Sequence, residues 1–203
     1  MKWADFAPYV MPHVLGCPVP VLVHHARLAS IEFFRRTNAF TRTLDAVYTY
    51  GQPSVDIEGY DSETSVSRVL AATVDGREFD LIEPRSGVAL LRDDSRREFA
   101  FTQDMLTLTI NPLQARRLPV VIDAALVPSL TSLGLNDDVA RLYVSDIATG
   151  VISSIQRLPG QKFTNAGEAE LNARLFEHRI STTCAKVQRG SAASRTRPQR
   201  HYC

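Results

Sequence analysis

Histidine is the residue type best suited to bind a metal or move a proton near neutral pH, and this chain has five. His24 and His25 are adjacent, in a segment whose apolar spacing predicts a helix. Neighbouring residues on a helix point to different sides, which is a poor geometry for gripping one metal ion. His13 lies in a proline-rich start and His201 in a basic tail, so no regular element positions either. We interpret His24 and His25 as surface or interface histidines and predict no metal site.

The three cysteines, Cys17, Cys184 and Cys203, are far apart and form no CxxC pair. An odd number with wide spacing argues against a disulfide framework or a zinc site and favours a reducing compartment. Cys17 could serve as a nucleophile. However, Gly16-Cys17-Pro18 is more typical of a buried cysteine in a turn, packed beside the first helix.

The standard catalytic patterns are missing from the sequence. It contains no GxxxxGK[ST] or GxGxxG phosphate loop, no HExxH and no GxSxG. Two carboxylate pairs have structural explanations: Asp93-Asp94 stands beside three arginines in a polar stretch, and Asp137-Asp138 precedes a predicted helix, whose dipole favours negative charge. We therefore predict a protein that is not an enzyme and that has no cofactor.

The formal net charge is only +1, but the charges are unevenly distributed. Residues 178–203 contain six Lys or Arg and no Asp or Glu, which leaves residues 1–177 at about −5. An acidic body with a basic terminal segment favours docking of that segment on an acidic partner. A solvated terminus that aids solubility is an open alternative. A nucleic-acid contact is a further one, although Tyr202 is the segment's only aromatic residue and no known binding module is present.

The composition, 44% hydrophobic and 22% charged, is typical of a globular domain with a sizeable core. No apolar run approaches the ~18–20 residues that cross a bilayer. The start, MKWADFAPYV, has no apolar segment of the kind found in signal peptides.

The first 43 residues predict an irregular segment followed by a helix. Residues 1–20 contain four prolines and a glycine, so we expect an irregular start, anchored on the body by Trp3, Phe6 and Tyr9. The helix begins near Pro18 or Pro20, either of which suits a first turn, and ends near Asn38. Apolar residues on one face recur every three or four positions, at Leu22, Ala26, Ala29 and Phe33.

From about residue 44 to 128 the pattern changes to the alternation of β-strands. The predicted strands are LDAVYTY, SVDIE, SVSRVLAATV, REFDLIEP, REFAF, MLTLTINP and PVVIDAALVP. Asp75-Gly76, between the third and fourth of them, predicts a tight β-hairpin. Short strands with turn signals every 8–12 residues are typical of a small antiparallel sandwich or barrel. The SGVALLR and DDSRR stretches remain unassigned.

Helical periodicity returns after Pro128. Asn136 or Asp137 is the expected cap of one helix, whose apolar positions are Val139, Tyr143, Ile147, Val151, Ile155 and Leu158. Gly150, inside it, either permits close approach of another helix or is simply tolerated. Thr164 or Asn165 caps a last helix, expected to stop near Gly190. Its stripe is Ala166, Ala169, Ala173, Phe176, Ile180, Cys184 and Val187.

These elements predict an α+β protein, with one N-terminal and two C-terminal helices in a bundle and the β block inserted between them. We expect an N-terminal segment and first bundle helix over 1–43, an antiparallel sandwich or barrel-like β domain over 44–128, and bundle helices over 129–190. Residues 191–203 are expected to form an extended basic arm.

Four stretches, taken in order, carry a resemblance to a known family. They are VMPHVLGCPVPVLVHHARLASIEFFRRTNAF, the hairpin TVDGREFDLIEP, PVVIDAALVPSL with the helices up to HRI, and the arm from Gly190 to Cys203. The matching positions of the third stretch are Ile147, Gly150, Leu158, Pro159, Ala169 and Phe176. This order is similar to that of the head-to-tail adaptor (gateway, or tail tubular A-like) proteins of short-tailed bacteriophages. The likeness spans about residues 10–195 and lies in the order and length of the parts.

Two positions depart from the family's pattern. Ser153-Ser154 stand where small apolar residues are expected, and the aromatic run at the end of the first helix lacks the usual cysteine or tryptophan.

The resemblance implies a structural virion protein that assembles as a ring, commonly a dodecamer, between the portal and the tail nozzle or fibres. Viral DNA would pass through its channel without sequence-specific binding, and no membrane would be involved. The protein would be located in the phage tail or neck, and in the host cytoplasm during assembly. The arm would bind the portal protein through five residues, Arg189, Arg195, Arg197, Arg200 and Tyr202.

Two other classes of function stay open at this stage. One is a head-completion or tail-completion neck protein of a long-tailed phage. The other is an enzyme with a cryptic site or a nucleic-acid-binding regulator.

Overall fold

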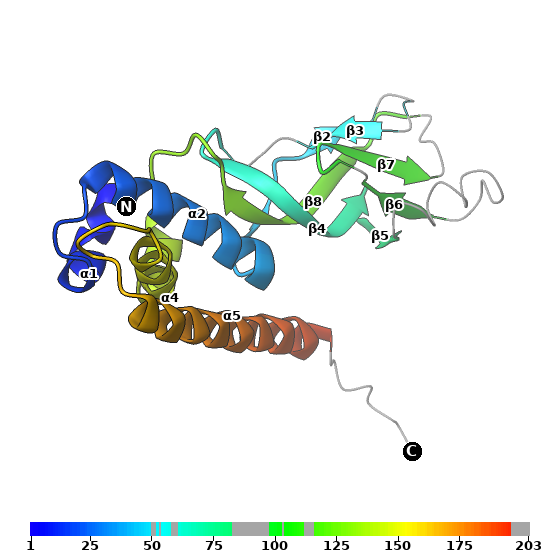
Figure 1. Ribbon diagram of the computed structural model, residues 1–203. Helices are drawn as coiled ribbons and strands as arrows, with labels where there is room; N and C mark the ends of the chain where they lie inside the picture. Colours follow the sequence, from blue (N-terminus) through cyan, green and yellow to red (C-terminus); the bar gives the residue numbers. More distant parts are fainter. Residues whose placement is uncertain are drawn as a thin grey trace, which may run out of the picture. The chain divides into compact units, whose positions relative to one another are not determined.

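The computed structural model describes residues 1–49, 52, 54–57, 61–82, 98–102, 104–111 and 116–195, the last five of these as backbone only. The protein is α+β, as predicted, with four α-helices and a curled mixed sheet in the described residues (Figure 1). It divides into two compact units. The helical unit comprises Met1–Ala39 and Leu133–Cys203, and the β unit comprises Phe40–Ser132, four residues beyond the expected 44–128 at each end.

Helix α2 (Val19–Thr37) confirms the helix predicted in the first part of the chain. Pro18 is its N-cap and Pro20 lies in the first turn, where the missing N–H leaves no carbonyl unpaired. Asn38 ends it in the left-handed conformation, with φ of 51°. Residues on more than one side of the helix are buried, Phe33 and Phe34 among them, whereas Leu28 and Arg36 are exposed.

The irregular start predicted for residues 1–20 is wrong for residues 3–13 and correct for residues 14–18. The chain forms a 3-10 turn η1 (Trp3–Phe6), a short helix α1 (Ala7–Val10) and a second 3-10 turn η2 (Met11–His13). A helix tolerates proline at its first positions, and Pro8 and Pro12 stand at such positions. The number of prolines alone was therefore a poor guide to the structure of this segment.

Of the three aromatic residues expected to anchor this segment, two are buried and one is exposed. Trp3 and Phe6 are buried, at 2% and 0% exposure, as predicted. Tyr9 is 46% exposed, so its assignment as an anchor is wrong. A one-turn helix buries one side only, and Phe6 and Val10, four residues apart, occupy that side.

Helix α4 (Asp137–Gln156) begins at the predicted cap, since Asn136 Oδ1 accepts a hydrogen bond of 3.1 Å from the Asp138 N–H. The aspartate pair lies in its first turn, where the helix dipole favours negative charge. The buried apolar positions include the predicted Val139, Ile147, Val151 and Ile155.

Helix α5 (Ala166–Arg195) begins after Asn165, whose Oδ1 accepts from the Glu168 N–H. It does not stop at Gly190 as predicted but continues for five residues. An exposed glycine destabilises a helix by only about 1 kcal/mol relative to alanine, and Ala192 and Ala193 then favour the helix. The first five residues of the expected extended arm are therefore helical, and residues 196–203 lie outside the described part.

The β unit contains the predicted strands, several of them shortened. They are β1 (Thr41–Thr43), β2 (Val47–Tyr48), β3 (Ser54–Asp56), β4 (Thr64–Val74), β5 (Arg77–Leu81), β6 (Phe99–Phe101), β7 (Thr107–Asn111) and β8 (Pro119–Pro128). Their order in the sheet is β1-β8-β4-β5-β6-β7-β3, and β2 also pairs with β8. The SGVALLR and DDSRR stretches lie outside the described residues.

The β4–β5 hairpin confirms its turn signal. Asp75 and Gly76 have φ of 50° and 77°, so both central residues adopt the positive φ of a type I′ turn. The flanking residues Val74 and Arg77 pair directly across it.

The purely antiparallel sheet we expected is wrong at one pair, because β5 and β6 run parallel. A two-residue turn forces antiparallel pairing. The 17 residues between Leu81 and Phe99 are long enough to connect two parallel strands, and the sequence pattern did not distinguish the two directions.

The beginning of the β unit also differs from prediction. The expected strand LDAVYTY is reduced to the two residues of β2, and β1 was missed. Strand β1 is the polar sequence TRT, which has no apolar alternation to reveal it. It forms through backbone pairing with β8, supported by a 2.5 Å hydrogen bond from Thr43 Oγ1 to Asp123 Oδ1.

Candidate functional site

A groove of about 490 Å³ lies between α2, α4 and α5 in the helical unit. Leu28 and Glu32 line it from α2, Gly150 from α4, and Phe176 and Glu177 from α5. All three helices pack on one another, so rigid elements hold the walls of the groove. We regard this groove and the exposed end of α5 as the two candidate functional regions of the helical unit.

Gly150 sets how closely α4 and α5 approach. A Cβ atom built on Gly150 would lie 2.8 Å from the ring of Phe176, closer than carbon atoms can pack. Next to this contact, Ser153 Oγ donates a 2.9 Å hydrogen bond to the Ala169 carbonyl on α5. Of the two explanations considered for Gly150, close approach of a neighbouring helix is therefore the correct one.

An ion pair joins α2 to α5 at one end of the groove. The Arg36 guanidinium donates to both carboxylate oxygens of Glu177, at 2.6 and 2.5 Å, and to Glu32 Oε1 at 3.2 Å. The hydrogen bond from Arg36 lowers the pKa of Glu177 and, in return, raises the pKa of Arg36. Both side chains are substantially exposed, 40% for Arg36 and 54% for Glu177, so water screens the pair.

Replacing Glu177 with glutamine is expected to lower the free energy of unfolding at pH 7 by less than about 1 kcal/mol, because the pair is exposed. The folded-state pKa of Glu177 is depressed, so its contribution is complete at neutral pH. It disappears only as the pH falls below the ordinary glutamate pKa of about 4.3. Urea unfolding of the wild type and of Glu177→Gln, from neutral pH to below the glutamate pKa, measures the difference in their free energies of unfolding. A difference that grew as the solution became more acidic would contradict the assignment.

The other end of the groove is basic. Arg157 is exposed there, and His25 from α2 lines the same groove. The pKa of His25 is lowered, mainly by burial and secondarily by the charge of His24, whose ring lies 5.5 Å away, centroid to centroid. The groove thus has apolar walls between the ion cluster of Arg36, Glu32 and Glu177 and the exposed guanidinium of Arg157, and its volume would admit a side chain of a partner.

The hydroxyl groups of the two serines in the groove both donate hydrogen bonds to backbone carbonyls. Ser153 donates to α5, as described, and Ser154 Oγ donates to the Val151 carbonyl at 2.8 Å. The hydrogen-bonding needs of both hydroxyls are therefore met by the helix backbones. This is why serine is compatible with positions where the resemblance leads us to expect small apolar residues.

Gln156, which is 1% exposed, fastens the N-terminal segment to α4 and α5. Its Nε2 donates to the His13 carbonyl at 3.3 Å and to Glu168 Oε2 at 2.9 Å. Its Oε1 accepts from Asn172 Nδ2 at 3.2 Å. The turn around His13 is therefore held against the end of α4.

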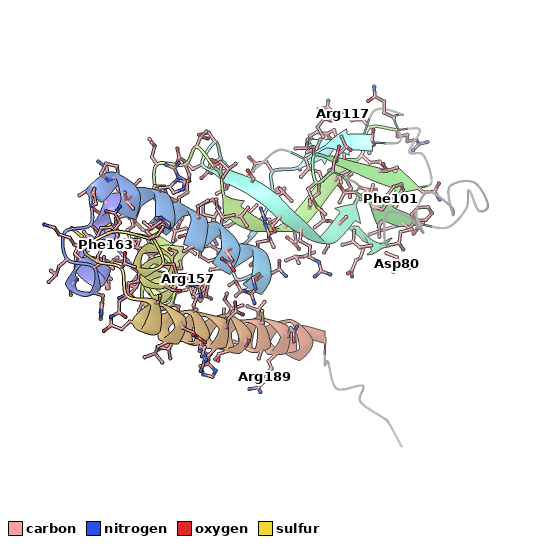
Figure 2. All side chains as sticks on the ribbon, viewed as in Figure 1. Asp80, Phe101, Arg117, Arg157, Phe163 and Arg189 are labelled. Carbon is pink, nitrogen blue, oxygen red and sulfur yellow. The ribbon has the colours of Figure 1, made fainter. Side chains whose placement is uncertain are left out.

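The residues predicted to bind the portal are only partly described. Arg189 is exposed on α5, and Arg195 is the last residue of that helix, known as backbone only. Arg197, Arg200 and Tyr202 lie outside the described residues. Among the α5 side chains that the structure describes, the last buried ones are Ile180 and Thr183, whereas residues 188–190 are exposed. Figure 2 places Arg189 toward the C-terminal end of α5.

The cysteines and aspartate pairs considered in the sequence make structural contacts where they are described. Cys17 is buried at 3% exposure, as predicted, and burial raises the pKa of its thiol. Cys184 Sγ lies 3.1 Å from the Arg36 carbonyl oxygen. Asp137 pairs with the amino group of Met1, which lowers the pKa of this carboxyl. The pair Asp93-Asp94 and Cys203 lie outside the described residues.

Within the part of the chain that the structure describes, no group of three or more His, Cys, Asp or Glu side chains could hold a metal ion. In the same residues, no helix combines the length and the apolar character required to cross a bilayer.

The groove was not predicted from the sequence. Leu28 and Glu32 fall off the apolar stripe of α2, and Arg157 lies in a turn, so no pattern connects them. The one available signal was Gly150 inside a helix, because glycine there requires a reason such as a large side chain packed against it.

No protein-family model matches the chain, and a search of curated proteins finds no match either. The class of function therefore has to be argued from the two units, the groove and the end of α5.

Proposed function

We propose that this chain is a structural virion protein, the head-to-tail adaptor that joins the portal to the tail nozzle or fibres of a short-tailed phage. In this proposal α2, α4 and α5 are the helical bundle, and the β unit is an inserted barrel-like domain that contacts the tail. The adaptor acts by binding, as a homo-oligomeric ring, and needs no cofactor.

The observation that carries the proposal is the basic end of α5. The helix has 30 residues, and among its side chains up to residue 190, which the structure describes, the last buried one is that of Thr183. Twelve further residues to Arg195 extend the helix by about 18 Å at 1.5 Å per residue. Lys186 and Arg189 are exposed on this extension, and no Asp or Glu follows Glu177 in the sequence. A cationic helix end of this kind is suited to docking on an acidic surface of the portal.

Deleting residues 190–203 tests this role. The deletion removes no buried side chain among the described residues, so we expect a folded protein with unchanged Trp3 fluorescence. We also expect that it no longer joins purified portal rings, as observed by negative-stain electron microscopy and co-sedimentation. Normal occupancy of the rings by the truncated protein would refute the role of the arm.

A full-length control separates charge from length. Changing Arg189, Arg195, Arg197 and Arg200 to glutamine keeps every residue but removes four positive charges. We expect weakened portal binding in this variant and a steep loss of wild-type binding as salt is added. Electron microscopy of the assembled particle tests the class of protein, since the position and the symmetry of the ring distinguish this adaptor from a neck protein of a long-tailed phage.

A further inference from the structure

We draw no further inference here: the strongest candidate, the groove between α2, α4 and α5, belongs to the site already described, and nothing in the structure shows what covers it, because the exposed Arg157 at one end and the ion cluster of Glu32, Arg36 and Glu177 at the other favour neither an acidic nor a basic occupant.

Discussion

Replacing Gly150 with valine is expected to lower the free energy of unfolding of the helical unit by about 3 kcal/mol, at the upper end of the usual range for overpacked sites. The added side chain would begin 2.8 Å from the Phe176 ring. The ring is 6% exposed and packs on Phe33, with 6.2 Å between the ring centroids, so any movement of the ring disturbs this contact. Either α5 moves away from α4 or the ring is displaced, and both distort the groove.

Tryptophan fluorescence during urea unfolding measures this loss. Trp3 is the only tryptophan and is buried in the helical unit, so its signal reports that unit. The matched control is Gly190→Val, since a Cβ on Gly190 meets nothing within 4 Å and should leave stability nearly unchanged. Adding Gly150→Val to a Phe176→Ala background should cause a much smaller loss than in the wild type. Equal losses in both backgrounds would disprove the proposed clash.

Replacing Phe33 with alanine is expected to lower the free energy of unfolding of the helical unit by about 3–5 kcal/mol. Phe33 is fully buried on α2, and its ring packs against residues of all three long helices. The centroid of the Phe33 ring lies 5.3 Å from the ring centroids of Phe34 and Tyr143 and 6.2 Å from that of Phe176. Truncation therefore leaves a cavity where the three helices meet, and the surrounding rings can refill only part of it.

The same Trp3 measurement applies to this variant. Leu28→Ala, on the same helix but at a side chain 42% exposed, is the control and should cause a loss of about 1 kcal/mol or less. A Phe33→Ala protein as stable as this control would show that the three helices do not share a core at Phe33.

The parts of the fold predicted correctly depend on local signals. The Asp75-Gly76 turn was predictable because a type I′ turn requires positive φ at two successive positions, which Asp and Gly tolerate. The start of α4 was predictable because Asn136 can cap only the N–H groups that immediately follow it. The start of α5 depends in the same way on Asn165, whereas the end of α2 depends on the left-handed backbone conformation that Asn38 tolerates.

The failures occurred where distant residues decide the structure. Strand β1 has a polar sequence, and β8, about 80 residues away, recruits it. The parallel pairing of β5 and β6 depends on the path of a long connection. Tyr9 is exposed because Phe6 and Val10 occupy the buried side of a single turn. None of these competitions is visible in a short window of sequence.

The sequence by itself determined the alternation of helical and β segments, the turns and caps, and the basic charge of the last 26 residues. These properties depend on backbone preferences and charges that each residue carries wherever it lies. Only the tertiary structure decided that Gly150 lies under Phe176, that Arg36 pairs with Glu177, and that Gln156 joins the turn around His13 to α4 and α5. Such contacts join residues far apart in the chain, and their energies depend on distance in space.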